Sequence, residues 1–274
     1  MNDFADRIAI LTGGASGIGR AVAEEMARRG AVVVVADRDG ERAEGVAEGI
    51  RRAGGRARAA RLDVTDAGAF QALVDATVER DGRLDYLFNN AGVGVTGEVR
   101  DLPAAAWDRV IDVNLRGVVH GVRAAYPQMI RQGSGHIFNT ACVAGLVPFP
   151  MTAAYCATKH AVVALSTALR AEAAALGVRV SVVCPGVVDT GMFEAIEYFR
   201  VDKGAVLADV RPALMPVEKC ARAILAGVRR NRAVILVTAH ARLAWWLYRL
   251  APRSFLRITS LAYRRARRRL RTGP

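Results

Sequence analysis

The chain has 274 residues, a formal net charge of +13 and a hydrophobic fraction of 52%. Its length favours one large domain with a substantial core. Residues 1–218 hold 24 Lys and Arg against 26 Asp and Glu, whereas residues 219–274 hold 15 basic residues and no acidic one. A nearly neutral body with a cationic end argues against a nucleic-acid-binding fold.

Targeting and redox signals are few. The N-terminal residues are acidic where a secretory signal would be basic, and no long apolar run follows, so we expect no signal peptide. Four cysteines, at positions 142, 156, 184 and 220, have neither metal-site spacing nor a paired pattern. We therefore expect no metal site and a reduced, cytoplasmic environment.

The first predicted strand leads into a glycine-rich turn. Ile8–Thr12 is a short apolar run, followed by Thr12-Gly13-Gly14-Ala15-Ser16-Gly17-Ile18-Gly19 and a helix-forming stretch over 20–27. In this order the glycines let the backbone approach a pyrophosphate, and the first helical N–H groups point at it. The segment predicts a dinucleotide-binding site, with a plain tight turn as the alternative.

A second predicted strand, residues 31–36, ends at Asp37. A carboxylate at this place accepts hydrogen bonds from a ribose and repels a 2′-phosphate, which favours NAD over NADP. Arg38 is the competing signal, because a guanidinium there suits that phosphate. Since Ser16 rather than a base precedes the second motif glycine, NAD remains the preferred cofactor.

Helix and strand patterns alternate along the rest of the chain. We expect helices over 39–53, 66–80 and 103–131, and strands over 56–62, 84–88, 136–140, 178–183 and 233–237. This alternation predicts an α/β, Rossmann-like, doubly wound fold with a seven-stranded, mainly parallel sheet and helices on both faces. Residues 1–239 would form a single Rossmann-fold domain, and 240–274 a helical, basic extension.

Tyr155 and Lys159 lie four residues apart, on one face of a predicted helix. A nearby cation stabilises a phenolate and lowers its pKa, which makes Tyr155 a candidate general acid and base. The spacing also occurs by chance in surface helices. Asn114 is an unfavourable residue in mid-helix and has either a role in the site or a plain surface or helix-bending position.

Together these motifs resemble the short-chain dehydrogenase/reductase family over roughly residues 6–240. The resemblance rests on T-G-x-x-x-G-x-G at 12–19, N-N-A-G at 89–92, Asn114, Y-x-x-x-K at 155–159, and P-G followed by Thr190. It implies an NAD(P)-dependent oxidoreductase that acts on CH–OH groups and forms a homodimer or homotetramer.

The resemblance also implies residue roles. Tyr155 would exchange the proton, Lys159 would bind the ribose and lower the pKa of Tyr155, and Asn114 would anchor a water that links Lys159 to solvent. The cofactor would be held by Tyr155, Lys159 and the residues Gly13, Ser16, Gly17, Ile18, Gly19, Asp37 with Arg38, Asp63, Val64, Asn90, Ala91, Gly92, Pro185, Gly186, Val188 and Thr190.

Cys142 departs from the family pattern, which has a serine thirteen residues before the catalytic tyrosine. A thiol is a weaker hydrogen-bond donor than a hydroxyl and should stabilise a developing alkoxide less well. Cys142 is thus a tolerated catalytic replacement, the mark of an impaired or altered enzyme, or a redox-sensitive thiol. Thr140, two residues back on the same side of a strand, is a distant partial substitute.

The segment Gly191–Met215 is rich in apolar residues, as are residues 143–151. These side chains favour a hydrophobic secondary alcohol or ketone, such as a steroid-, retinoid- or lipid-like substrate, unless they only pack the segment against the body. A different class of function, a catalytically impaired NAD-binding scaffold or sensor that acts through the basic tail, is the alternative.

In residues 240–274, Leu243, Trp246, Leu247 and Leu250 have the spacing of one helical face, and Pro252 interrupts the helix. A second helix would follow, with Phe255, Ile258 and Ala262 on one side and arginines at its end. No uncharged stretch reaches the ~18 residues that span a bilayer. The extension is therefore predicted to lie on an anionic membrane surface or to pack on the active-site cleft or another subunit; nucleic acid is the least favoured partner.

Overall fold

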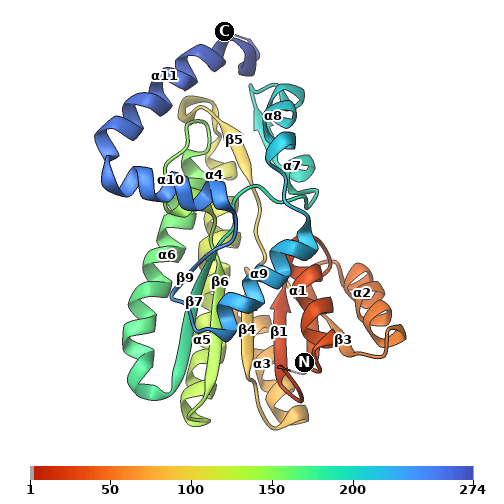
Figure 1. Cartoon of the computed structure of the whole chain (residues 1–274). Helices are drawn as coiled ribbons and strands as arrows, with labels where there is room; N and C mark the ends of the chain where they lie inside the picture. Colours follow the sequence, from red (N-terminus) through yellow and green to blue (C-terminus); the bar gives the residue numbers. More distant parts are fainter. Residues whose placement is uncertain (1–2, 274) are drawn as a thin grey trace.

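A computed structural model describes residues 3–273 (Figure 1). Its centre is a parallel sheet of seven strands in the order β3-β2-β1-β4-β6-β7-β9. The strands are β1 (Ile8–Thr12), β2 (Val32–Asp37), β3 (Arg56–Arg61), β4 (Tyr86–Asn89), β6 (Gly135–Thr140), β7 (Val178–Cys184) and β9 (Val234–Leu236). The predicted doubly wound, Rossmann-like fold is confirmed.

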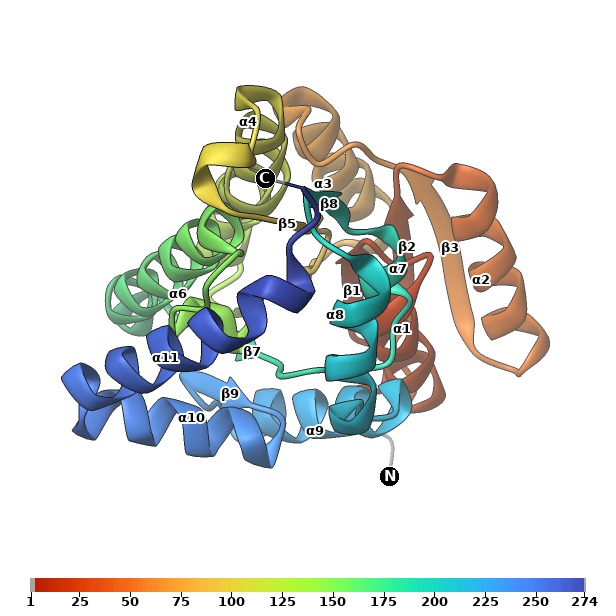
Figure 2. The same cartoon turned by 90° about the horizontal axis from the view of Figure 1, so that it is seen from above.

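Helices cover both faces of this sheet, as the view from above shows (Figure 2). Because successive strand residues point to opposite faces, Ala9 and Leu11 belong to one core cluster while Ile10 belongs to the other. The first cluster packs under α1 (Gly17–Arg28), α2 (Gly40–Arg52) and α9 (Val217–Arg229). The second packs under α3 (Ala67–Asp81), α5 (Gly117–Arg131) and α6 (Ala153–Ala173).

The stretch predicted as one helix over 103–131 contains a change of helix type. α4 (Ala104–Ile111) passes into a π-helical turn, Asp112–Arg116, and then into α5. Such turns are rare and often occur at functional sites. Asn114 lies in this turn and is fully buried, which excludes the plain surface position.

A second layer lies beyond the carboxyl ends of the strands (Figure 1). It contains a parallel pair that the sequence did not reveal, β5 (Val95–Gly97) with β8 (Glu197–Phe199). The helices of this layer are α7 (Met192–Ala195), α8 (Lys203–Val210), α10 (Ala239–Leu250) and α11 (Pro252–Leu270). Single 3-10 turns occur at Val99–Asp101, Val143–Gly145, Ala174–Leu176 and Arg211–Ala213.

Candidate active site

The glycine turn after β1 has the form that a pyrophosphate needs. Gly13 and Gly17 have positive φ of 61° and 51°, and a Cβ on Gly19 would clash with the carbonyl oxygen of Gly13. Ser16 is the N-cap of α1, but its side chain makes no capping hydrogen bond. The first N–H groups of α1 therefore have no side-chain acceptor, and the backbone around them is open to an anion.

Asp37, at the end of β2, lies beside this turn. Its Oδ2 accepts a hydrogen bond from the backbone N–H of Ala15 at 3.1 Å, which holds the carboxylate where a ribose would lie. Arg38 is exposed, and its charge helps to lower the pKa of Asp63, although hydrogen bonds from Thr65 contribute more to that shift. These residues fit the adenosine half of a dinucleotide, with Asp37 turned inward and Arg38 turned outward.

Val64 and Ile18 belong to the packing around this half of the site. Val64 is buried, and its carbonyl oxygen lies 2.9 Å from Nδ1 of His120 on α5. Ile18 packs against the first core cluster. Both residues position the backbone that would face the cofactor.

A hydrogen-bonded network links the glycine turn to the N-N-A-G segment. Thr12 Oγ1 accepts from the N–H groups of Asn90 and Ala91 at 3.0 and 3.1 Å, and Asn90 Nδ2 donates to the carbonyl of Thr12 at 3.1 Å. Thr12 was not among the predicted site residues, although it stands at the head of the glycine motif.

Lys159 and Tyr155 come together on α6, as their spacing predicted. Lys159 is only 2% exposed, its Nζ donates to the carbonyl of Thr140 at 2.9 Å, and the same atom lies 5.6 Å from the centre of the Tyr155 ring. Burial lowers the pKa of Lys159 to about 8 and raises the pKa of Tyr155 well above its usual value. Burial thus outweighs the lowering that the neighbouring cation was expected to cause.

Asn114 holds the backbone that follows the N-N-A-G motif. Its Oδ1 accepts from the N–H of Val93 at 2.8 Å, and its Nδ2 donates to the carbonyl of Val93 at 2.9 Å. Gly92 lies between two polar groups, because a Cβ there would be 3.2 Å from Asn114 Oδ1 and 3.6 Å from Lys159 Nζ. Asn114 therefore fixes the backbone at residues 92–93, which lies next to Lys159.

Cys142 lies half-buried between β6 and the Val143–Gly145 turn, next to Tyr155. The thiol and the phenol are close enough for each to influence the other's pKa, and burial raises the pKa of the thiol. A raised pKa disfavours the thiolate and so argues against the redox-sensitive interpretation. Thr140 is directed elsewhere, since its Oγ1 donates to Asn90 Oδ1 at 3.4 Å, and it is a poor substitute for a serine hydroxyl.

The segment from Pro185 to Thr190 connects the Cys142 turn with the glycine turn. The carbonyl of Pro185 accepts from the N–H of Val143 at 2.8 Å, which couples this segment to the Cys142 turn. Thr190 lies against the glycine turn, where a Cβ on Gly17 would be 3.1 Å from Thr190 Cβ. Val188 is buried and pairs with Met215 in an isolated parallel bridge.

His240, at the start of the extension, contacts the same segment. Its Nε2 accepts from the N–H of Val187 at 3.2 Å and lies 3.1 Å from Thr238 Oγ1. A Cβ on Gly186 would overlap the side chains of both His240 and Thr238, so a larger residue there would displace them. No sequence motif indicated His240.

The two faces of α10 have different surroundings. Ala241, Ala244, Trp245 and Tyr248 pack on Val143 and Val147 beside Cys142, whereas the predicted stripe, Leu243, Trp246, Leu247 and Leu250, is exposed. On α11, Phe255, Ile258 and Ala262 lie within one helix, as predicted, but only Phe255 is partly buried. Phe255 contacts Tyr248, whereas Ile258 is 65% exposed, because the inner face instead follows Phe255, Thr259 and Tyr263.

An acid–base cluster anchors the end of α11 to the second layer. Glu98 Oε1 accepts from Arg267 Nε at 2.6 Å and from the Tyr263 hydroxyl, and Arg271 pairs with both Glu98 and Asp101. Hydrogen bonds from Arg267 and Tyr263 lower the pKa of Glu98 to about 2. Two backbone hydrogen bonds, Asp202 N to Leu270 O and Thr272 N to Arg200 O, tie the chain end to the segment after β8.

The family model for short chain dehydrogenases matches residues 7–200. The chain belongs to this family. A crystal structure of a short chain dehydrogenase/reductase from Burkholderia phymatum in complex with NAD is similar at 35% identity and a TM-score of 0.81, with 91% of this chain and 96% of that one covered. The LigD apo form from Sphingobium is similar at 29% identity and a TM-score of 0.77, over 90% of this chain and 96% of that one.

Two curated relatives are also similar to this chain. The probable oxidoreductase EphD of Mycobacterium tuberculosis is 35% identical over 92% of this chain, a share larger than residues 1–239 alone, so the match continues into the extension. This chain spans less than half, 44%, of that relative's length. The dehydrogenase LinX of Sphingobium indicum, named for 2,5-dichloro-2,5-cyclohexadiene-1,4-diol, is 40% identical over 69% of this chain and 76% of its own.

Within residues 3–273, no helix combines the length and apolar character that crossing a bilayer requires.

Proposed function

We propose that the protein is an NAD-dependent oxidoreductase that moves a hydride between the cofactor and a hydrophobic secondary alcohol or ketone. The observation that carries this proposal is the convergence of Tyr155, Lys159 and Cys142 next to an open glycine turn, with Asp37 beside it. NAD supplies the hydride acceptor or donor when it is bound.

Tyr155, Cys142 and Lys159 each have a separate role in the proposed reaction. Tyr155 exchanges the proton of the substrate hydroxyl, and Cys142 donates a weak hydrogen bond to the same oxygen. Lys159, held by Thr140, provides a buried cation next to the phenol. Because burial raises the pKa of Tyr155, the neutral phenol predominates near pH 7, so reduction of a ketone starts from the correct protonation state and oxidation of an alcohol gains rate with rising pH.

The preference for NAD rests on Asp37. A 2′-phosphate would meet this inward carboxylate, while Arg38 is directed toward solvent and Asp63. The Asp37→Ser variant should lower the ratio of kcat/KM for NAD over NADP by at least tenfold. A ratio unchanged by the substitution would refute the assignment.

The hydrophobic substrate class is supported by the apolar side chains near Cys142. The same apolar cluster as Cys142 contains Val143, Leu146, Trp245 and Tyr248. The apolar residues of the segment 192–215 are mostly half-buried and do not belong to the core. Within a series of 2-alkanols, each added CH₂ that enters such a site should raise kcat/KM by up to about fourfold, equivalent to ~0.8 kcal/mol. A flat or falling series would favour a polar substrate.

The scaffold alternative keeps NAD binding and lacks turnover. NADH formation over a panel of secondary alcohols, with Tyr155→Phe as the blank, separates the two functions, because only an enzyme exceeds the blank. We also propose a cytoplasmic homodimer or homotetramer, which analytical ultracentrifugation of the full chain would test.

A further inference from the structure

The extension carries most of the exposed large hydrophobic side chains of the described residues. Ten large hydrophobic side chains are exposed within residues 3–273, and seven of them lie on α10 and α11. These seven, which we call the outer face, are Leu243, Trp246, Leu247, Leu250, Leu256, Ile258 and Leu261. Exposed apolar side chains that are concentrated on one part of a molecule mark an interaction site more often than singly scattered ones do.

The outer face is not required for the packing of the extension on its own domain. α10 docks through Ala241, Ala244 and Trp245, and α11 docks through Phe255 and the cluster around Glu98. Both helices are therefore held in place by their other sides. The outer face remains available to a partner.

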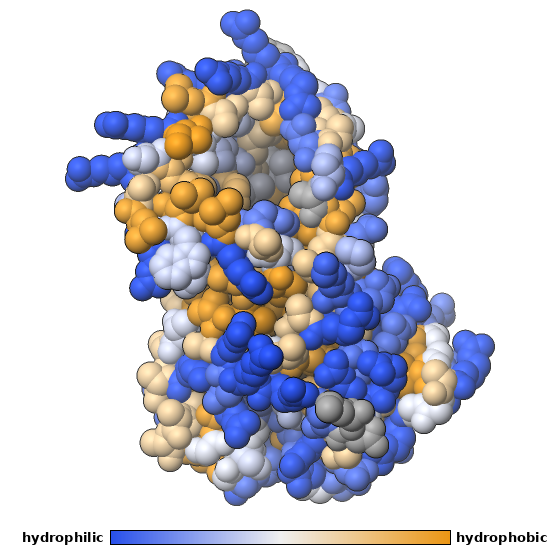
Figure 3. Space-filling view, viewed as in Figure 1, coloured by the Kyte–Doolittle hydropathy of each residue, from blue (hydrophilic) through white to orange (hydrophobic). Residues whose placement is uncertain are grey.

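Cations flank the outer face, and neither helix carries an acidic residue. Within the described residues, Arg253, Arg257, Arg264, Arg265 and Arg268 make no ion pair, in contrast to Arg267, Arg269 and Arg271. Apolar and pale aromatic side chains gather over α10 and α11 with basic ones projecting beyond them (Figure 3).

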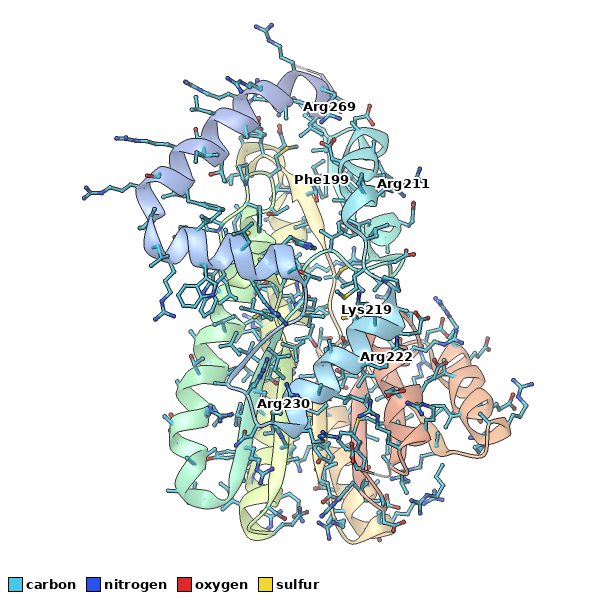
Figure 4. All side chains as sticks on the ribbon, in the orientation of Figure 1. Phe199, Arg211, Lys219, Arg222, Arg230 and Arg269 are labelled. Carbon is cyan, nitrogen blue, oxygen red and sulfur yellow. The ribbon has the colours of Figure 1, made fainter. Side chains whose placement is uncertain are left out.

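The basic surface continues along the neighbouring helix. Lys219, Arg222 and Arg230 project from α9 or its end, on the side that also presents α10 (Figure 4). Arg269, by contrast, reaches toward α8, where it pairs with Asp209 at 2.5 Å. Among the described residues, cations without an ion pair therefore lie on α11 and continue onto α9, on the same side of the molecule as α10.

We propose that the outer face of α10 and α11 binds an anionic membrane surface. The exposed leucines, isoleucine and tryptophan would enter the interfacial region, and the unpaired arginines would contact acidic headgroups. A second copy of the chain is a poorer partner, because it would bring the same cations and no acids to the contact. Nucleic acid offers no complement to the apolar side chains.

Membrane binding goes beyond the proposed oxidoreductase function and does not depend on turnover. It would nevertheless bring a lipid-like substrate close to the site, since the opposite sides of the same helices pack beside Cys142. One helix diameter, roughly 10 Å, would separate the two.

Co-sedimentation of the full chain with vesicles tests the proposal. Binding to phosphatidylserine-containing vesicles should exceed binding to pure phosphatidylcholine vesicles by at least tenfold and weaken with added salt. The Trp246→Glu/Leu247→Glu variant should lose at least tenfold in binding. Leu176→Glu is the matched control, because Leu176 is exposed before β7, at the amino-terminal edge of the sheet, and should bind like the unmodified chain.

A second variant tests the charges. Replacing Arg264, Arg265 and Arg268 by Gln should weaken binding to anionic vesicles by on the order of a hundredfold, since each arginine near such a surface contributes roughly fivefold. Unchanged NADH binding in every variant verifies that the fold is intact. Equal binding to both vesicle types, equal binding of the Glu variant and its control, or a change only in oligomeric state would overturn the proposal.

Discussion

Replacement of Cys142 by serine tests whether the thiol limits turnover. The side chain lies beside Tyr155, where it would donate a hydrogen bond to the oxygen of the substrate. Loss of one such donor in other enzymes reduces kcat by about 10²- to 10³-fold, roughly 2.7–4 kcal/mol. A thiol retains part of that donation, and Thr140 does not replace it because its hydroxyl is directed to Asn90.

We therefore expect Cys142→Ser to raise kcat by about ten- to a hundredfold, equivalent to ~1.4–2.7 kcal/mol. KM should change little, because the donor acts mainly on charge that develops in the transition state. Steady-state rates with NADH and a ketone, or NAD and a secondary alcohol, measure the effect. Fluorescence titration with NADH should give the same affinity for both proteins.

Cys156→Ser is the matched control for this prediction. The Cys156 thiol lies 3.3 Å from Thr152 Oγ1, so a serine hydroxyl finds a partner there without approaching the substrate oxygen. Its kcat should stay within about twofold of the starting protein. If Cys142→Ser binds NADH normally and turns over no faster, the thiol is not a compromised donor and the reasoning fails.

Three further predictions concern the cofactor turn, the buried lysine and the anchor of α11. Gly19→Ala should abolish NADH binding, because the new Cβ clashes with the backbone. Gly45→Ala is the control: it lies in open space on α2, so NADH binding should persist and stability should change by no more than about 1 kcal/mol. Equal NADH binding by both variants would contradict the assignment of the glycine turn to the cofactor. The pKa of Lys159 is about 8 in the folded protein against 10.5 ordinarily, so the unfolded state binds more protons between these two pH values. The free energy of unfolding should therefore rise by up to about 3 kcal/mol across this range. Urea unfolding measured against pH should show the rise in the Lys219→Met control and not in Lys159→Met. The pKa of Glu98 is lowered to about 2 from 4.5, so its contribution to stability is complete above pH 4.5 and disappears as the pH falls toward 2. The free energy of unfolding of a Glu98→Gln variant should therefore differ from that of the starting protein above pH 4.5 and match it near pH 2. A difference that stays constant with pH would exclude a role for the ionisation of Glu98.

The apolar rhythm of the chain predicted the sheet and its helices well, because strand and helix periods are local properties of the sequence. β1 has the predicted bounds, and the predicted break at Pro252 separates α10 from α11. The glycine spacing likewise predicted the turn before α1, since positive φ and close backbone approach select glycine at particular positions. The roles of individual cofactor residues remain predictions that binding experiments must test.

Other features depend on contacts between residues far apart in the chain. The π-helical turn around Asn114 forms where the side chain reaches Val93, and the β5–β8 pair joins segments about a hundred residues apart. The pKa of Tyr155 also follows from burial, which no local spacing reveals.

The extension shows the same division. Its amphipathic spacing was evident from Leu243 to Leu250, but the spacing does not say which face the domain covers. Ala241 and Trp245 pack inward because the Val143–Gly145 turn offers a complementary apolar surface, and Glu98 draws in Arg267 from α11. The sequence by itself thus determined the fold, the glycine turn and the Tyr155–Lys159 pair through local patterns. Only the tertiary structure decided how Cys142 is surrounded and which side of the extension faces outward, because both depend on long-range packing and burial.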